Sequence, residues 1–472
     1  MFVKRFFEPK LAQTSYLIGC AAHKVAIVID PNRDVQQYID AAKAEGATIA
    51  HVTETHIHAD FLSGARELAA KTGATLYLSD EGDADWKYAF AAADHATLLH
   101  GGDHITVGNI DFEVLHTPGH TPEHISFLVT DGAVADEPIA AVTGDFIFVG
   151  DVGRPDLLEK AANIKGTMEA GAKQLWASLE KFRARPDYLQ IWPGHGAGSS
   201  CGKGISAIPH STLGYEKRFN WAFQAKNEAD FTANVLSGQP DPPKYFSEMK
   251  KLNKMGPRIL GGFLRPAGKN AGELDALLSN GATVVDMRPA GEFAAGAIPG
   301  TISIPMNGSF TTWAGWLVPY DKDFYLIGDA AAVDLAVRDL AMIGLDRIGG
   351  WFAPSVVGDW ASSHSAPLSV IPQVTAQDLA QSLKHGAVTL VDVRNPGEWS
   401  AAHIDGATHI PLGRLEERLA EIPRDKPIVL QCAAGARSMI GASILKAHGV
   451  DRVINLIGGF GAWSNAGLPT VK

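Results

Sequence analysis

Short blocks of alternating apolar and polar positions run through the first half of the chain. Residues 103–115 and 125–130 follow this pattern between turn residues, which predicts strands. Residues 61–71 and 164–182 are longer stretches typical of helices. Sheets flanked by helices fit this order, whereas a strictly regular alternation of strand and helix does not. The first half therefore predicts an α+β architecture.

The second half contains an internal repeat. Residues 282–305 and 387–411 each run from a β-branched strand through Asp-x-Arg and a Glu-containing helical turn to a short strand ending in Ile-Pro. Residues 344–350 are echoed in the same way by residues 449–459. Each repeat of roughly 100 residues has the size of a normal domain. Strands that alternate with helical segments predict a parallel α/β sheet in each repeat.

These patterns divide the chain into three predicted domains. At 472 residues, one compact core is not expected, and two to four domains are normal for this length. A Pro-containing segment at 238–243 leads out of the first domain, and residues 363–372 have the composition of a linker. We therefore expect domains at residues 1–245, 246–362 and 363–472.

Composition and charge narrow the classes of function. The net charge of −11 argues against a nucleic-acid binder, which normally presents a basic face. No apolar run is long enough to span a bilayer, and the N-terminus lacks the continuous apolar core of a signal peptide. The three cysteines, Cys20, Cys201 and Cys432, do not form a disulfide framework. We expect a cytoplasmic protein that binds neither nucleic acid nor membrane.

A dense group of metal-ligand residues lies in the first domain. His56, His58 and Asp60 fall within five positions, directly after the strand-like stretch 47–52. His120, Asp145 and His195 follow later, each beside glycine in a loop after a predicted strand. Single residues of these types often only cap turns, but ligands on loops held by a sheet are the usual construction of a metal site.

Two further residues near these motifs have open roles. Arg154 follows Asp145 closely and is expected either to hold a substrate carboxylate or to hold a neighbouring loop. Cys201 lies six residues after His195 and is either an accessory thiol near the site or a small buried residue.

A second chemical motif lies in the third domain. A buried strand delivers Cys432 to its C-terminal end, a short loop containing Gly435 follows, and a helix is expected from about Ser438. Backbone N–H groups and the positive end of the helix would point at the sulfur and favour the thiolate. Arg437 supplies a cation for an anionic sulfur substrate.

The first domain resembles the metallo-β-lactamase superfamily, whose fold is an αββα sandwich with metal at one edge. In two-metal hydrolases of the superfamily the first motif is HxHxDH, but the final position here is Phe61, so one ligand of the second metal is missing. By this resemblance, His56, His120 and Asp145 match the iron ligands of persulfide dioxygenases, a facial triad that leaves three positions open. His58, Asp60 and His195 then orient these ligands or serve as additional metal ligands.

The third domain resembles rhodanese, a sulfurtransferase with a Cys-x-x-Gly-x-Arg loop. The resemblance implies that Cys432 carries sulfane sulfur as a persulfide, that Gly435 and Arg437 contribute to the substrate loop, and that Asp392 and Arg394 form a structural ion pair. In the second domain, also an α/β rhodanese-like unit, Asp329 stands where the cysteine is expected, and the segment from there to the following Gly-x-Asp is two residues shorter. We expect an inactive domain that acts as a spacer or docking surface.

The order of the three domains resembles bacterial persulfide dioxygenase–rhodanese fusions. This resemblance implies mononuclear Fe(II) that oxidises a low-molecular-weight persulfide with O₂ to sulfite and thiol, and a Cys432 that forms or uses thiosulfate. It also implies a homo-oligomer. Two alternatives stay open: a zinc-dependent, glyoxalase II-like thioester hydrolase fused to a sulfurtransferase, and a non-catalytic sulfur carrier or sensor that uses Cys432 only to dock persulfide.

Overall fold

The computed structural model describes residues 1–157, 159, 166–239 and 241–472, which form two compact units. Unit 1 comprises Met1–Phe263 with Ala341–Gly344, and unit 2 comprises Leu264–Leu340 with Leu345–Lys472. No helix among the described residues is both long and apolar enough to cross a membrane. The predicted domain boundaries at residues 245 and 362 remain predictions.

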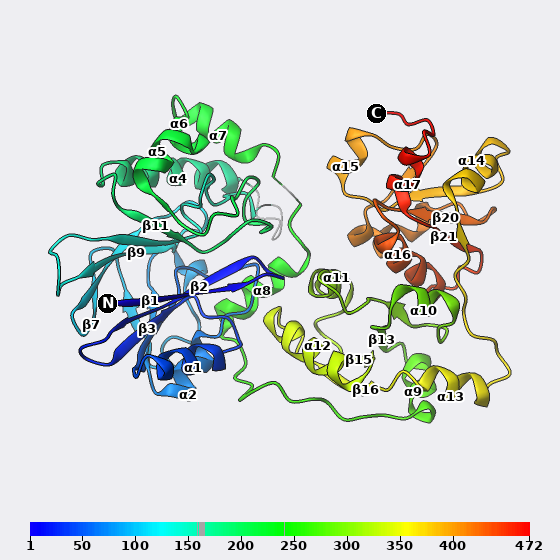
Figure 1. The fold of residues 1–472 in the computed structure, drawn as a ribbon, viewed down its shortest axis with the longest axis horizontal. Coiled ribbons are helices and arrows are strands. Elements are labelled where there is room, and N and C mark those ends of the chain that lie inside the picture. The colour runs from blue at the N-terminus through cyan, green and yellow to red at the C-terminus, as the bar shows by residue number, and fades with distance from the viewer. Residues whose placement is uncertain (158, 160–165, 240) are drawn as a thin grey trace. The chain divides into compact units, whose positions relative to one another are not determined.

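Unit 1 contains two six-stranded sheets (Figure 1). The first has the order β1-β2-β3-β4-β5-β6 and the second the order β12-β11-β10-β9-β8-β7. The strands of the first sheet are β1 Phe2–Glu8, β2 Gln13–Cys20, β3 Val25–Ile29, β4 Thr48–Thr53, β5 Thr75–Ser79 and β6 Thr97–Leu99. Those of the second are β7 His104–Val107, β8 Ile110–His116, β9 Ile125–Asp131, β10 Ala140–Gly144, β11 Gln190–Pro193 and β12 Ser211–Thr212.

Both faces of each sheet in unit 1 are covered. Because strand side chains alternate, Ile18 and Ile27 join Phe112 and Phe127 between the sheets, where they form one buried cluster. The opposite face of the first sheet packs on α1 (Gln36–Ala44) and α2 (Ala65–Thr72). The outer face of the second sheet packs on helices α4 (Thr167–Arg183), α5 (Leu213–Phe219), α6 (Trp221–Gln224) and α7 (Glu228–Leu236). This arrangement confirms the predicted helix–sheet–sheet–helix sandwich.

The two helices predicted in unit 1 begin later in the structure than the sequence pattern suggests. The helix expected at 61–71 begins only at Ala65, because backbone N–H groups just before it bond elsewhere: Gly64 donates to Pro31 O and Ser63 donates to Asn253. The helix expected at 164–182 corresponds to α4, and its expected residues 164 and 165 lie outside the described residues.

Unit 2 contains two parallel sheets. The four-stranded sheet has the order β14-β13-β15-β16, and the five-stranded sheet has the order β17-β21-β20-β18-β19. Their strands are β13 Thr283–Asp286, β14 Ile302–Ser303, β15 Phe324–Ile327, β16 Ile348–Phe352, β17 Gln373–Val374, β18 Thr389–Asp392, β19 Thr408–His409, β20 Ile428–Gln431 and β21 Val453–Leu456. The parallel α/β prediction for both repeats is confirmed.

Helices surround these sheets (Figure 1). The first repeat has α9 Ala271–Ser279, α10 Ala290–Ala295, α11 Phe310–Leu317, α12 Ala330–Met342 and α13 Val356–Ser363. The second repeat has α14 Ala376–Lys384, α15 Pro396–Ala401, α16 Ala436–Ala447 and α17 Gly459–Asn465. The Asp-x-Arg motif of each repeat forms a side-chain pair at a strand end, Asp286 with Arg288 and Asp392 with Arg394, at 2.7 Å in both. The predicted ion pair is thus confirmed.

The sheet register corrects the expected counterpart of Cys432. Asp392 pairs with Gln431, the residue before Cys432, and the equivalent Asp286 pairs with Ile327. The residue after Ile327 is Gly328, so the strand position of the cysteine is occupied by glycine and not by Asp329. Sequence comparison misplaced it because the loop between strand and helix is two residues shorter.

Asp329 instead serves the following helix. Its Oδ1 accepts the N–H of Ala332 at 2.8 Å, in the first turn of α12. The prediction that this repeat lacks the sulfur-carrying thiol holds in either alignment.

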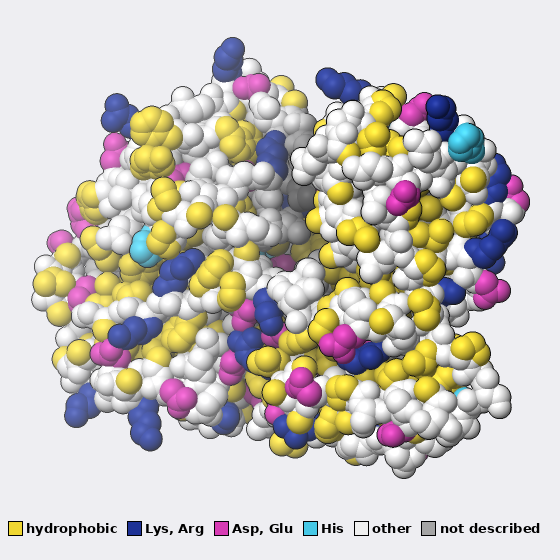
Figure 2. Space-filling view, turned by 45° about the vertical axis from the view of Figure 1, so that its right-hand side comes forward, with side chains coloured by type: hydrophobic (Ala, Val, Ile, Leu, Met, Phe, Trp, Pro, Cys, Tyr) yellow, Lys and Arg dark blue, Asp and Glu magenta, His cyan; other side chains and the backbone are white. Residues whose placement is uncertain are grey.

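On the face shown in Figure 2, acidic and basic side chains are interspersed among the described residues. The absence of nucleic-acid binding remains a prediction.

Candidate metal centre and sulfur loop

Three predicted ligands meet in the interior of unit 1. His56 follows β4, His120 lies between β8 and β9, and Asp145 follows β10. One ligand atom from each lies within 4.8 Å of the others, and all three side chains are buried. Each residue therefore stands on a loop between strands or shortly after one, as the sequence predicts.

Hydrogen bonds orient the two imidazoles. Nδ1 of His56 lies 3.0 Å from Thr55 Oγ1, and Nδ1 of His120 lies 3.0 Å from the carbonyl oxygen of Arg154. With Nδ1 protonated in each bond, Nε2 keeps its lone pair for a ligand. Burial lowers the pKa of both His56 and His120, which keeps the rings neutral as metal ligation requires.

The ligand atoms of this cluster lack ordinary partners. Among the described residues, neither Nε2 of His56 nor either carboxylate oxygen of Asp145 has a hydrogen-bond partner. Buried polar atoms normally have one. Nε2 of His120 lies 3.4 Å from Asp145 Oδ2. Two neutral imidazoles and a carboxylate that converge in this way fit a divalent transition metal.

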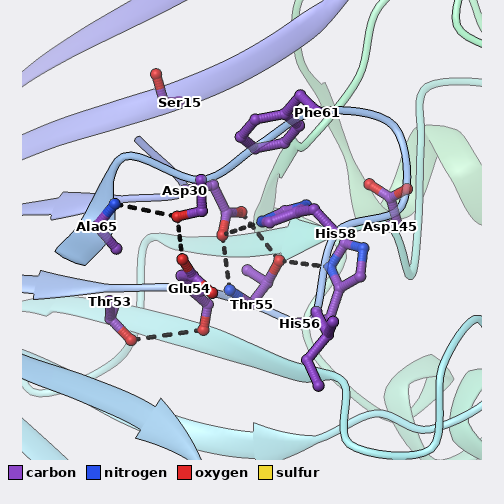
Figure 3. A network of polar contacts seen from close by, with 12 residues as sticks. Ser15, Asp30, Thr53, Glu54, Thr55, His56, His58, Phe61, Ala65 and Asp145 are labelled. Atoms are coloured by element: carbon purple, nitrogen blue, oxygen red, sulfur yellow. Dashed lines mark hydrogen bonds and ion pairs between the residues drawn. The ribbon is translucent and has the colours of Figure 1, made fainter. Parts of the chain in front are cut away.

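His58 points away from this cluster to Asp30 (Figure 3). Its Nε2 lies 3.1 Å from Asp30 Oδ1, and Asp30 also accepts the backbone N–H of Thr55 at 2.7 Å and its hydroxyl at 2.9 Å. Burial alone would lower the pKa of His58, but the charge and hydrogen bond of Asp30 outweigh it and raise the pKa to about 9. These contacts favour an orienting role for His58 over direct binding of a metal.

A second group lies on the other side of Asp145. Ligand atoms of Asp60, His195 and Cys201 lie within 4.8 Å of one another, and all three residues are buried. His195 Nε2 lies 3.2 Å from Asp60 Oδ2 and 3.4 Å from Asp145 Oδ1. Burial raises the pKa of the Cys201 thiol to about 12. Both descriptions of Cys201 that the sequence left open apply, because its thiol is buried and also lies beside the metal-ligand candidates.

Arg154 is fully buried beneath this region. Its Nε and Nη2 donate to the two carboxylate oxygens of Asp156 at 2.7 and 2.8 Å, and Nη1 donates to Ser200 O at 2.9 Å. Because the guanidinium bonds the polar loop around Ser200, the geometry favours the loop-holding role over contact with substrate.

Two residues that the sequence did not signal shape the metal centre. Asn253, in α8 (Tyr245–Met255), donates to the carbonyl oxygens of His58 and Phe61 at 2.8 Å each. Gly153 lies against Asp145, where an added β-carbon would come within 1.8 Å of the Asp145 carbonyl oxygen. Asn253 follows these motifs by about 190 residues, so no local pattern could have identified it.

The sulfur loop of unit 2 curls around Cys432 between β20 and α16. Sγ accepts the N–H of Gly435 at 3.1 Å and the hydroxyl of Ser438 at 3.4 Å. The helix begins at Ala436, two residues earlier than predicted, because Gly435 caps it with a φ of +96°. A backbone N–H donor to the sulfur is present as expected, that of Gly435, and Ser438 adds a hydroxyl donor.

Arg437 lies on the same loop and is held by Glu398. Its two terminal nitrogens each donate to a Glu398 oxygen at 2.7 Å. Such a bidentate pair fixes the direction of the guanidinium. The sequence indicated Glu398 only as part of a helical turn.

Comparison with known proteins agrees with this combination of a buried His–His–Asp cluster and a sulfur loop. The family model described as metallo-beta-lactamase superfamily matches residues 9–195, and that described as rhodanese-like domain matches residues 375–466. The chain belongs to the metallo-β-lactamase superfamily and carries a rhodanese-like domain near its C-terminal end. Its sequence is 46% identical to that of a metallo-beta-lactamase from Staphylococcus aureus whose crystal structure is known. The alignment covers 75% of this chain and 99% of that one, and the two structures match with a TM-score of 0.67.

Curated relatives of the N-terminal half have different activities. A hydroxyacylglutathione hydrolase from Rhodospirillum rubrum is 31% identical over 38% of this chain and 60% of its own length. The mitochondrial persulfide dioxygenase ETHE1 of Bos taurus is 26% identical over 41% of this chain and 68% of its own length. The chain spans about half to three fifths of the length of several other curated relatives that it matches.

The C-terminal domain matches a small protein. A sulfurtransferase from Allochromatium vinosum is 37% identical over 22% of this chain and 96% of its own length. The chain therefore combines a metallo-β-lactamase superfamily domain with a rhodanese-like domain.

Proposed function

We propose that this chain oxidises a low-molecular-weight persulfide, RSSH, with O₂ to sulfite and the thiol RSH, and that Cys432 transfers sulfane sulfur. The observation that carries the proposal is the convergence of His56, His120 and Asp145 in a chain that also holds a sulfur loop. Among the described residues, Nε2 of His56 and both carboxylate oxygens of Asp145 lack a hydrogen bond. Ferrous iron bound by two histidines and a carboxylate supplies open positions for a sulfur ligand and O₂.

The chain's own residues prepare this site. Thr55 and the carbonyl oxygen of Arg154 hold the two imidazoles in the tautomers that ligation needs. His58 is held by Asp30, and its ring packs against that of His56 with 4.2 Å between the ring centroids, so it helps to orient His56. The apolar ring of Phe61 lies 4.3 Å from the ring of His58 and adds no further ligand there.

The sulfur loop supports the second half of the proposal. The Gly435 N–H and the Ser438 hydroxyl donate to Sγ of Cys432 beside the N-terminus of α16, and the same donors hold the sulfur when it reacts as the thiolate. That thiolate attacks the outer sulfur of a persulfide or thiosulfate, and the other fragment leaves with the electron pair. The resulting Cys432 persulfide is then used by sulfite or a thiol.

A zinc-dependent thioester hydrolase is the second candidate. The match to a hydroxyacylglutathione hydrolase supports it, and so does the second group of ligands, Asp60, His195 and Cys201. A two-metal site would use both groups, with metal-bound hydroxide as the nucleophile.

Anaerobic purification, metal quantification and oxygen uptake separate the two candidates. We expect about one iron per chain and O₂ consumption with glutathione persulfide that yields sulfite. His120→Ala removes both iron and uptake, whereas His104→Ala, which changes an exposed histidine on β7, keeps them. Two zinc ions per chain and thioester hydrolysis without oxygen uptake would instead establish the hydrolase.

A Cys432→Ser variant tests the transfer half separately. We expect it to retain oxygen uptake and to lose thiosulfate formation. Retention of thiosulfate formation would exclude Cys432 as the sulfur carrier.

A further inference from the structure

A cavity of about 830 Å³ lies at the carboxyl-terminal edge of the four-stranded sheet in unit 2. Gly328 and Asp329, which follow β15, line it together with Ala331 on the first turn of α12. Met287 and Arg288, which follow β13, line the adjacent wall. In parallel α/β sheets, ligands bind outside the carboxyl ends of the strands. The cysteine-less repeat thus keeps a binding cleft at the place where the other repeat keeps its thiol.

The sulfurtransferase domain closes this cavity. Ala436, Arg437 and Ile440, on the first two turns of α16, form the facing wall. Ala436 directly follows Gly435, whose N–H donates to Cys432 Sγ. The cavity therefore lies against the first turns of α16, directly after the loop that carries the reactive sulfur.

The two repeats of unit 2 are firmly packed around the cavity. Phe293 and Ala297 of the first repeat share one buried cluster with Ile440 of the second. The N–H of Ser303 donates to Ser443 Oγ at 2.9 Å in the interior of this interface. The cavity is thus part of a packed interface between the two repeats.

The lining indicates the chemical class of the occupant. Met306, Trp313 and Leu335 provide an apolar wall. The charged lining residues are of both signs, with Arg288 paired to Asp286 and Arg437 paired to Glu398, and with Glu292 and Asp329 as the acidic groups. A volume in this range suits a small organic ligand. Sulfite and thiosulfate are much smaller and have no apolar part. A zwitterionic organic molecule with an aliphatic body matches both the wall and the charges.

We propose that this cavity binds the organic part of an amino-acid- or peptide-type thiol, RSH or RSSH, that exchanges sulfane sulfur with Cys432. The inference rests on the proposed sulfur transfer by Cys432 and adds its substrate class. It assigns the cysteine-less repeat a role in substrate selection.

The exchange balances without an added oxidant or reductant. The thiolate of RSH forms a bond to the outer sulfur of the Cys432 persulfide, and the bond from that sulfur to Sγ breaks with its electron pair on Sγ. The proton released by RSH returns to the Cys432 thiolate or to the new persulfide. The reverse reaction loads Cys432 from RSSH.

Binding is tested first in the full chain carrying Cys432→Ser, which cannot exchange sulfur. S-methylglutathione and S-methylcysteine, whose blocked sulfurs do not react, are titrated by calorimetry. We expect at least one to bind, and Ala331→Trp, which fills the cavity from an exposed position, to weaken binding about tenfold or more. Asp329→Asn, which removes a charge from the lining, weakens it less. Asp334→Asn removes an equal charge from the same helix outside the cavity and leaves binding as it was.

Turnover is tested next in the chain with Cys432 intact and thiosulfate as donor. The value of kcat/KM is measured with glutathione and with cyanide as the sulfur acceptor, and the two values are compared as a ratio. We expect Ala331→Trp to lower the glutathione-to-cyanide ratio about tenfold. Asp334→Asn should leave this ratio as it is in the unmodified chain. Absence of binding by both probes, or binding and ratios unaffected by Ala331→Trp, overturns the cavity assignment. Binding that is sensitive to Ala331→Trp without any sulfur transfer would overturn the proposed function and leave the cavity assignment standing.

Discussion

The hydroxyl of Thr55 lies 3.0 Å from Nδ1 of the adjacent His56. The same hydroxyl lies 2.9 Å from Oδ2 of Asp30 (Figure 3). Since a carboxylate only accepts, Thr55 donates to Asp30 and accepts from His56. This chain of two hydrogen bonds decides which nitrogen of His56 is free to bind a metal.

Replacing Thr55 by Val removes both hydrogen bonds with little change in side-chain size. We expect iron affinity to fall by about 10- to 100-fold, as is usual when a group that orients a metal ligand is lost. Competition with a chelator measures this change. Thr53→Val is the matched control, because the Thr53 hydroxyl only approaches the Glu54 carbonyl oxygen at 3.5 Å. Equal affinity in the two variants would show that Thr55 does not position His56.

Gly153 leaves no room for a side chain beside the metal centre. A β-carbon there would lie 1.8 Å from the Asp145 carbonyl oxygen and 3.0 Å from the β-carbon of His120. Gly153→Ala therefore displaces two of the three ligands, at a cost of about 1–3 kcal/mol in stability and with loss of most bound iron. Metal analysis and thermal unfolding check this. Gly204→Ala, where the nearest atom lies 3.7 Å away, should retain its iron.

The bidentate pair of Arg437 with Glu398 is expected to set the rate of sulfur transfer. Arg437→Lys keeps the charge but loses the planar fork, so kcat/KM for thiosulfate should fall about tenfold. Arg418→Lys changes a similar pair with Glu421 in the same domain, outside the sulfur loop, and should leave the rate as it was. Equal rates in the unmodified chain and Arg437→Lys would show that a point charge suffices.

The two cysteines of unit 1 should differ in their reaction with iodoacetamide. Burial would raise the pKa of Cys20, but hydrogen bonds from Asn109 and His23 outweigh it and lower the pKa to about 7, whereas burial raises that of Cys201 to about 12. A lowered pKa moves the thiolate to lower pH, so Cys20 ionises between pH 6 and 8 and Cys201 stays a thiol. Labelling of Cys20 should rise about tenfold over this range.

Peptide mass spectrometry of native protein measures this labelling. His23→Ala removes one partner of the Cys20 sulfur and should shift the labelling profile to higher pH. If Cys201 were labelled as fast as Cys20 at pH 8, the lowered pKa of Cys20 and the raised pKa of Cys201 would be contradicted.

The sequence was most informative where chemistry and local structure coincide. His56, His120 and Asp145 could be predicted as ligand candidates, together with His58, Asp60 and His195, because strand ends and the loops after them can be recognised from local periodicity. The choice of these three as the ligands came from the resemblance to persulfide dioxygenases. Asp30 and Asn253 could not be predicted, since each contacts the site through the folding of the chain and has no motif of its own.

The alignment of the two repeats illustrates the same limit. Sequence comparison placed Asp329 opposite Cys432, and strand pairing replaced it with Gly328. The length of the loop depends on where the strand ends and where the helix begins. When one repeat has a loop two residues shorter, the residues of that loop no longer align one to one with those of the other repeat.

The sequence by itself determined the layers of the sandwich, the parallel repeats and the chemical types available at each site, because side-chain periodicity and turn residues act over a few positions. The tertiary structure decided that His58 binds Asp30, that Cys201 joins Asp60 and His195, and that α16 closes a cavity over the cysteine-less repeat. These contacts join distant segments, and packing and burial across the whole chain select them.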